Sequence, residues 1–239
     1  MATVSEASEL PGLKVVDAFD LDVGVRALLR PGEMVKDREG RRHRLPRYFY
    51  EIPSHAEAKS IRLTNNFKLN EFIQVDIREA PELQDYPRYI PCAVRLLAFY
   101  LQRVRETIGL SMHVAVNGGY RSPGHRMAVA ATPHMWGTAA DIYRVGTTIL
   151  RDEETITKYN RIAEDVSDDL WAMPFGHAEG QADDHIHLDL GYITLTPREI
   201  SEDRMEVPQE KPRFAFEDRR RSDRRTVAQP TEESATEPS

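Results

Sequence analysis

The chain has 239 residues, enough for one large domain or two small ones with a hydrophobic core. The 32 Lys and Arg residues and 39 Asp and Glu residues give a net charge of −7, which argues against a protein that binds duplex nucleic acid. The single cysteine, Cys92, excludes an intrachain disulfide and begins an apolar helical pattern, which predicts a buried and unreactive thiol.

The first residues are small and acidic, and they lack the basic and apolar regions of a signal peptide. No stretch approaches the ~18 consecutive apolar residues that a membrane-spanning helix needs. We therefore expect a monomer that is cytoplasmic as synthesised and has no membrane span. Release to a cell wall would need a route that the sequence does not encode.

Residues 1–60 are expected to form an N-terminal extension that is partly strand-rich and has no assigned function. A strand can begin at residue 13, and a hairpin is expected to turn at residues 39–40. The stretch R-Y-F-Y-E-I at 47–52 predicts a strand with its aromatic side chains packed inward. His43 lies among arginines, which favours a solvated surface histidine over a metal ligand.

Residues 61–208 are expected to form the main domain, an α+β fold with a small antiparallel sheet and helices on one side. The segment 66–75 predicts a short helix that docks apolar side chains. A longer helix is expected to open at Pro91 and end at Gly109, because apolar residues recur at steps of three and four. Its expected buried positions are Val94, Leu97, Ala98, Leu101, Val104 and Ile108.

Three further strands are expected, at residues 112–117, 139–145 and 185–190. Ser122 followed by Pro123 predicts the start of a helix between the first two of these strands. A charged amphipathic helix is expected within 152–170. Its predicted buried stripe consists of Ile156, Ile162, Ala163 and Val166.

Residues 209–239 are expected to form a disordered charged tail. They carry seven basic and seven acidic residues and few apolar ones, so they cannot bury enough apolar surface to fold. The arginine cluster within them could contact an anionic surface, but we expect a solvated tail instead.

Two separated stretches carry the residues of a possible metal site. H-M-W-G-T-A-A-D places His134 and Asp141 seven residues apart, and D-D-H-I-H-L-D-L places His185 and His187 on one face of a strand. Zinc accepts imidazole nitrogen and carboxylate oxygen, and three protein ligands leave a fourth position for water. Spacing alone leaves two interpretations open: a catalytic zinc site, or a surface strand that carries ion pairs.

The motif H-M-W-G-T-A-A-D resembles H-x-x-G-x-A-x-D of the zinc D-Ala-D-Ala carboxypeptidases and L-alanyl-D-glutamate endopeptidases, which share a zinc fold with hedgehog signalling domains. G-Y-R-S at 119–122 and H-I-H-L-D at 185–189 resemble that family's flanking motifs, and the likeness covers residues 66–192. The resemblance implies a hedgehog-like peptidase fold and a Zn2+ cofactor. It also implies that the zinc ligands are His134, Asp141 and His187.

The same resemblance implies the residues that act on the substrate. Asp184, three residues before the last ligand, would be the general base. His185 would stabilise the oxyanion, and Arg121 would bind a carboxylate or carbonyl oxygen of the substrate. Tyr120 and Ser122 would complete the substrate-binding set.

Other acidic residues near the last ligand remain candidates for the general base. Asp189 shares a strand face with both histidines and is the first alternative, and Glu179 in the preceding loop is the second. Asp183 also lies close by in the sequence.

The implied activity is that of a zinc metallopeptidase, a hydrolase that cuts peptidoglycan stem peptides of the cell wall through a metal-activated water. Both a carboxypeptidase and an endopeptidase fit the motifs. The alternative is a non-catalytic, zinc-stabilised binding module of the same fold, and a third possibility is a metal-independent interaction domain. The presence of Asp184, His185 and Arg121 together favours the enzyme, since a structural zinc site needs none of them.

Overall fold

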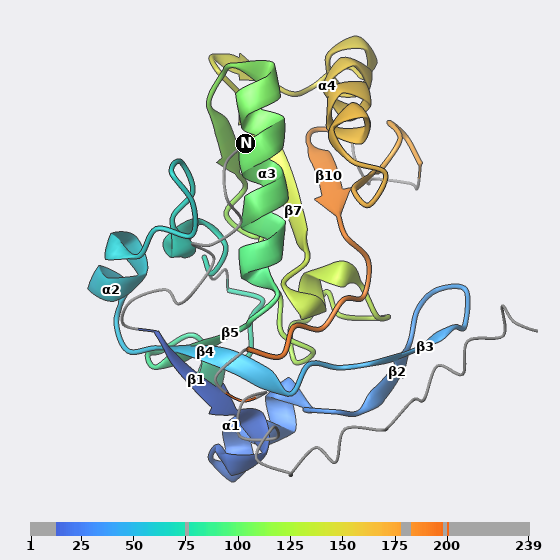
Figure 1. Cartoon of the computed structure of the whole chain (residues 1–239). Coiled ribbons are helices and arrows are strands. Elements are labelled where there is room, and N and C mark those ends of the chain that lie inside the picture. Colours follow the sequence, from blue (N-terminus) through green and yellow to red (C-terminus); the bar gives the residue numbers. More distant parts are fainter. Residues whose placement is uncertain (1–12, 75–76, 178–182, 198–199, 201–239) are drawn as a thin grey trace, which may run out of the picture. The chain divides into compact units, whose positions relative to one another are not determined.

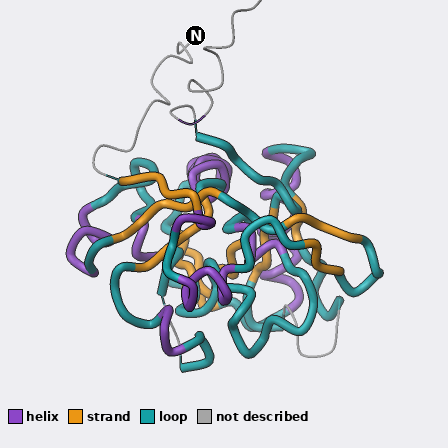
Figure 2. The backbone as a smooth tube through the Cα atoms, turned by 90° about the horizontal axis from the view of Figure 1, so that it is seen from below, coloured by secondary structure: helices purple, strands orange, loops and turns teal. Residues whose placement is uncertain are grey.

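The computed structural model describes residues 13–74, 77–177, 183–197 and 200. These residues form a mixed α/β structure with small antiparallel sheets and few helices, as expected (Figure 1). Loops join most of the short strands and helices, as a second view shows (Figure 2). The described residues all belong to one compact unit.

The first sheet ties the N-terminal part of the chain to its centre. It contains β1 (Lys14–Asp17), β4 (Tyr48–Ile52) and β5 (Arg88–Pro91), in the order β1-β4-β5. Phe49 pairs with Val16 of β1, and Tyr50 pairs with Ile90 of β5. All four side chains belong to the hydrophobic core that also contains the central helices. A domain boundary at residue 60 is therefore wrong, because the sheet and the core continue across it.

The strands β2 (Met34–Lys36) and β3 (Arg42–Arg44) form the expected hairpin. Gly40, in the turn between them, adopts a left-handed φ of 81°. The hairpin packs on a second apolar cluster around Trp136, whose indole Nε1 donates to the carbonyl of Arg44 at 3.1 Å. His43 stacks on Tyr192 with ring centroids 3.5 Å apart. The expectation of a solvated His43 is therefore wrong, since an aromatic ring covers its imidazole.

The second sheet has the order β6-β7-β10-β9, and β8 pairs with the last residues of β7. Ile142 of β7 lies opposite Ile186 of β10, and both side chains are buried in the core. Asp141 lies opposite His187, and because side chains alternate along a strand, this pair points to the other face. The strands are β6 (Met112–Val114), β7 (Ala139–Val145), β8 (Thr148–Ile149), β9 (Trp171–Ala172) and β10 (Ile186–Asp189).

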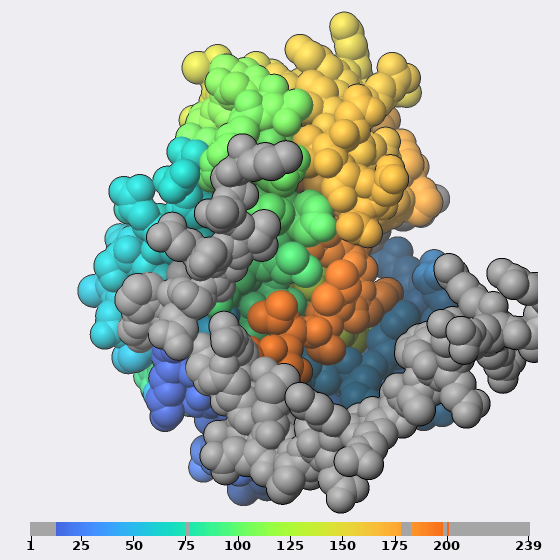
Figure 3. Space-filling model, in the orientation of Figure 1, coloured from blue at the N-terminus to red at the C-terminus, as the bar shows by residue number. Residues whose placement is uncertain are grey.

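Two amphipathic helices, α3 (Val94–Ile108) and α4 (Glu153–Val166), pack against each other and cover the apolar face of the second sheet. Figure 1 shows α3 in front of β7, and the surfaces of the two helices adjoin in Figure 3. The predicted stripe of α3 is buried except for Ile108, which is partly buried, and Gly109 ends the helix at a φ of 71°. In α4, Ile162 and Val166 are only partly buried, and Tyr159 joins the core instead.

Shorter helical segments complete the described part of the chain. The predicted short helix near residue 70 is present, and Phe67 and Phe72 beside it are buried. The segments are η1 (Ala18–Asp20), α1 (Val23–Leu29), α2 (His55–Ser60), η2 (Leu69–Glu71), η3 (Pro81–Leu83) and η4 (Pro133–Trp136).

The prediction of a helix after Ser122 is wrong, because residues 123–131 form turns. Some of their backbone amides donate to the carbonyl three residues earlier, as those of His125 and Ala128 do, and two donate to distant segments of the chain. The amide of Arg126 donates to the carbonyl of Arg78 at 2.9 Å, and the amide of Ala131 donates to the carbonyl of Lys36 at 2.8 Å. These contacts hold the segment against its neighbours without a helix.

Three further expectations concern the chain as a whole. Cys92 is buried, as predicted. Among the described residues, no helix combines the length and apolar composition that crossing a membrane requires. The charged tail expected at 209–239 lies outside the described residues.

Candidate metal centre

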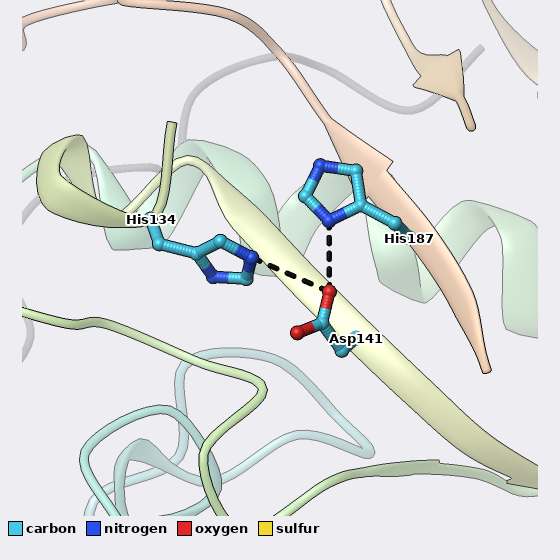
Figure 4. Close-up of side chains that lie close together, drawn as sticks. All are labelled: His134, Asp141 and His187. Atoms are coloured by element: carbon cyan, nitrogen blue, oxygen red, sulfur yellow. Dashed lines mark hydrogen bonds and ion pairs between the residues drawn. The ribbon is translucent and has the colours of Figure 1, made fainter. Parts of the chain in front are cut away.

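Three buried side chains, those of His134, Asp141 and His187, meet on the polar face of the second sheet (Figure 4). Their possible ligand atoms all lie within 4.8 Å of one another. Nε2 of His134 is 3.3 Å and Nδ1 of His187 is 2.8 Å from the same oxygen, Oδ1 of Asp141. The structure thus brings together the three residues that the sequence motif predicted, in an arrangement that could hold a metal ion.

The local sequence explains why these side chains converge. Gly137 ends η4 at a left-handed φ of 68°, which turns the chain from His134 into β7. Gly118 lies directly against Asp141, and a Cβ atom at this glycine would be 2.6 Å from the carbonyl oxygen of Asp141. The cross-strand pairing of β7 with β10 then brings His187 opposite Asp141.

Each histidine has its outer ring nitrogen fixed by an acceptor. Nδ1 of His134 is 2.7 Å from the carbonyl oxygen of Gly119, and Nε2 of His187 is 3.0 Å from Oδ2 of Asp189. Metal-binding histidines usually donate their second N–H to a carbonyl or carboxylate in this way, which fixes the ring and its tautomer. The inner nitrogens of both rings are therefore the ones directed at Asp141.

Arg121 determines the tautomer of His134. Its terminal nitrogen Nη2 is 2.8 Å from Nε2 of His134 and 2.6 Å from Oδ2 of Asp141. Because a guanidinium can only donate, Nε2 of His134 must accept, and the ring hydrogen must be on Nδ1. The lone pair that a metal ion needs is therefore directed into the cluster.

Burial and neighbouring charges set the protonation of the cluster. Burial lowers the pKa of His134 below 6.5, which keeps its imidazole neutral as metal binding requires. Burial would raise the pKa of Asp141, but hydrogen bonds from His134 and His187 and the charge of His187 hold it well below 3.8. Asp141 is therefore an anion at neutral pH, as a carboxylate that could bind a metal ion must be.

Of the three residues, His187 is the one whose inner ring nitrogen carries a proton that a metal ion would have to displace. Burial lowers its pKa, but hydrogen bonds to Asp141 and Asp189 and the charges of both carboxylates outweigh burial and raise it to about 9. Without a metal, its imidazolium bridges the two carboxylates. A divalent cation would replace the proton on Nδ1.

The two implied catalytic residues on the strand side lie at the edge of the cluster. Nε2 of His185 is 3.6 Å from Oδ1 of Asp141, and Nδ1 of His185 is 2.7 Å from Oδ1 of Asp184. The side chain of Asp184 is 85% exposed. Asp184 thus orients His185 toward the cluster and keeps its carboxylate in solvent.

The first alternative for the general base does not have the required position. Both oxygens of Asp189 are engaged behind His187, one by its Nε2 and the other by the amide of Gly191 at 2.7 Å. A base in that position would face the wrong side of the imidazole. Glu179, the second alternative, lies outside the described residues, and Asp183 is exposed.

Tyr120 and Ser122 do not line an accessible substrate site, so this part of the predicted substrate-binding set is wrong. Both are buried, and the hydroxyl of Ser122 donates to Oε1 of Glu79 at 2.6 Å. Side chains alternate along this extended segment, so only Arg121, between them, reaches the metal cluster. The sequence motif pointed to this segment but could not show which of its side chains face His134 and Asp141.

One residue near the cluster was missed by the sequence reasoning. Trp171 lies opposite Asp189 in the β9–β10 pairing, and its ring centroid is 6.1 Å from that of His187. It is 42% exposed, which is unusual for a large aromatic side chain. Its strand has only two residues, too few for a periodic pattern, so no local signal predicted its position.

A cavity of about 270 Å³ lies elsewhere, and no residue of the metal cluster lines it. Its walls are mainly apolar, and Arg47 at its rim is engaged by Asp17. It contains no cluster of possible metal ligands, so His134, Asp141 and His187 remain the candidate site. Comparisons of the chain with protein-family models, with characterised proteins and with solved structures find no match.

Proposed function

We propose that this chain is a zinc-dependent peptidase with a hedgehog-like peptidase fold, and that it hydrolyses peptide bonds of peptidoglycan stem peptides. One observation carries the proposal. The inner nitrogens of His134 and His187 converge on Asp141, while acceptors hold both outer nitrogens. This donor set of two nitrogens and one carboxylate suits zinc and leaves a coordination position open. The motif resemblance supports the substrate class.

The chemistry at this site divides between the cation and the chain. A zinc ion held there would supply an activated water and polarise the scissile carbonyl. Arg121 offers a fixed positive charge for a substrate oxygen, and His185 lies where it can donate to the same group. Asp184, solvent-exposed and bonded to His185, is the base that would take a proton and deliver it to the leaving amine.

A second candidate is a non-catalytic zinc module, and one observation favours it. The three ligand residues are at most 7% exposed, and Arg121 covers one side of the cluster by contacting both Asp141 and His134. A site closed in this way would hold the fold together and bind no substrate. The two candidates make different predictions for Asp184, which contacts His185 and none of the three ligand residues among the described contacts.

Incubation of the zinc-loaded protein with purified peptidoglycan, followed by mass spectrometry of the released fragments, tests the proposal. We expect cleaved stem peptides from the wild type. Asp184→Ala should bind zinc normally and release none, whereas Asp183→Ala, the matched neighbour, should behave like the wild type. His134→Ala should lose both zinc and activity. If the wild type binds zinc but releases no fragment, the non-catalytic module is the better account.

A further inference from the structure

Glu79 is a buried acidic residue that the proposed chemistry does not use. Its carboxylate accepts from the hydroxyl of Ser122 at 2.6 Å, from the amide of Ser122 at 3.2 Å and from the amide of Ala80 at 2.9 Å. Glu79 is 7% exposed and Ser122 is fully buried. A carboxylate is expensive to bury unless hydrogen bonds compensate it, so this arrangement is a built contact between distant parts of the chain.

This contact is made directly beside Arg121. On one side of the arginine, Ser122 is held by Glu79; on the other, the amide of Tyr120 donates to the carbonyl of Phe72 at 2.7 Å. The loop that carries both acceptors is itself fastened, because Nε2 of Gln84 donates to the carbonyl of Glu79 at 2.8 Å. Phe72 and Glu79 thus hold the backbone immediately before and after Arg121.

The side chains on either side of Arg121 point away from the metal cluster. Tyr120 and Ser122 line, together with Glu79, a cavity of about 20 Å³. Arg121 instead reaches Asp141 and His134. The hydrogen bonds between Glu79 and Ser122, which we call the brace, therefore hold this segment on the side opposite the metal cluster. The middle residue of the segment, Arg121, contacts the cluster.

We propose that Glu79 is a positioning residue for Arg121: by holding Ser122, it fixes the direction from which the guanidinium approaches the metal centre. Arginine has many rotamers, and a fixed backbone reduces the number that can place its charge correctly. The contact itself stands on the geometry, whereas its effect on catalysis rests on the proposed peptidase function.

A double-mutant cycle tests whether Glu79 acts through Arg121. Glu79→Gln keeps the shape of the side chain but places an NH2 group where acceptors now face Ser122. We expect kcat to fall about tenfold with KM and zinc content unchanged, and Arg121→Ala to lower kcat about 100-fold. Adding Glu79→Gln to Arg121→Ala should change kcat by less than about twofold. Equal losses in both backgrounds would overturn the proposal, since Glu79 would then act by another route.

Two further variants separate positioning from simple stability. Glu82→Gln, on the same loop but exposed, should leave kcat unchanged. Ser122→Ala removes the shortest bond of the brace from the other partner and should reproduce the kinetic loss of Glu79→Gln. A Ser122→Ala protein that folds and retains the wild-type kcat would overturn the proposal, and this variant serves even if Glu79→Gln does not fold.

A measurement on the metal-free protein keeps this proposal separate from the peptidase proposal. The Nε–H group of Arg121 donates to the carbonyl of Asn117 at 3.0 Å. The hydrogen on Nε should therefore exchange slowly with solvent, and NMR measures its exchange rate. We expect Glu79→Gln to accelerate that exchange about tenfold or more, with Arg121→Lys identifying the signal. If Glu79→Gln leaves this exchange rate unchanged, Glu79 does not position Arg121, even if the enzyme is active. Failure of the wild type to cut any peptide would refute the peptidase and leave this result standing.

Discussion

Asp189 accepts a hydrogen bond from Nε2 of His187 at 3.0 Å, on the side of the imidazole opposite Asp141. The second oxygen of Asp189 accepts from the amide of Gly191 at 2.7 Å, so the carboxylate itself cannot rotate freely. Such an outer carboxylate orients a histidine ligand and raises the basicity of its inner nitrogen. Asp189 therefore fixes the ring of His187 from the side opposite the candidate metal centre, although it is not one of the three residues that could hold the ion.

Replacing Asp189 should weaken zinc binding without removing a ligand. We expect Asp189→Asn to raise the Kd for zinc about 10- to 100-fold, because the imidazole of His187 loses its charged partner. Competition with a chromogenic chelator measures the change. Asp183→Asn, which alters an exposed carboxylate in the same region, is the control and should leave the Kd unchanged. Equal affinity in both variants would show that Asp189 does not support the site.

The metal-free protein should lose stability as the pH rises from about 6.5 to about 9. His187 has a pKa of about 9 in the folded state against 6.5 for an ordinary histidine, because the bonds and charges of Asp141 and Asp189 outweigh its burial. A raised pKa stabilises the fold fully below pH 6.5, and this contribution disappears as the pH passes through 9.

Urea unfolding at a series of pH values measures this loss. His187→Gln, which cannot titrate, should show a flatter profile over the same interval. Zinc should reverse the trend, because it replaces the proton on His187 and binds more tightly as that proton becomes easier to remove. A metal-free wild type whose stability rises over this interval contradicts the assigned protonation.

Gly118→Ala should damage the metal site through the backbone. The added Cβ atom would lie 2.6 Å from the carbonyl oxygen and 2.9 Å from Cβ of Asp141, so β7 must shift at the position of its ligand. We expect zinc stoichiometry well below that of the wild type, as measured by elemental analysis after dialysis. Gly24→Ala, whose Cβ would meet only the side chain of Asp22 at 3.2 Å, should bind zinc normally.

Trp171→Ala should impair substrate binding more than the chemical step. The indole is 42% exposed beside His187 but contacts no metal ligand through a hydrogen bond in the described structure. We expect KM for a stem peptide to rise about tenfold, consistent with the loss of about 1.4 kcal/mol of binding energy, while zinc content stays constant. Trp171→Phe should recover most of this loss. A change in kcat alone would mean that the ring acts on His187 instead.

A chain that begins at residue 61 should not fold. Its β5 would lack β4, and the core would lose Phe49 and Ile52, which are 1% and 0% exposed. Truncating large buried side chains typically costs several kcal/mol each, against a total stability of only about 5–15 kcal/mol. Circular dichroism and cooperative thermal unfolding test this, with a chain starting at residue 13 as the control. Cooperative unfolding of the shorter chain would restore the idea of a separate N-terminal extension.

The sequence predicted those parts of the site that depend on local pattern. Alternation along β7 and β10 determines which side chains share a face, so Asp141 could be assigned to one face of its strand and His187 to one face of its own. The apolar stripe of α3 was equally accessible, because a helix repeats over a few residues.

Features that depend on contacts between distant segments could not be predicted in this way. No periodicity shows that β4 pairs with β5, which is why the N-terminal strands were assigned to a separate region. For the same reason the contact of Glu79 could not be predicted, because its partner Ser122 lies 43 residues away in the sequence. Asp189 was recognised as close to the ligands, but only the paired strands show that it faces the back of His187.

Trp136 follows His134, a residue of the candidate metal centre, by two positions in η4, and its indole Nε1 donates to the carbonyl of Arg44 in β3. The position of His134 thus depends in part on a hairpin that lies far away in the sequence. The two residues joined by this bond are 92 positions apart. Substitutions in that hairpin would retune metal affinity from a distance. Two relatives with identical zinc motifs could therefore differ in their need for the metal, and alignment of the motifs alone would not reveal it.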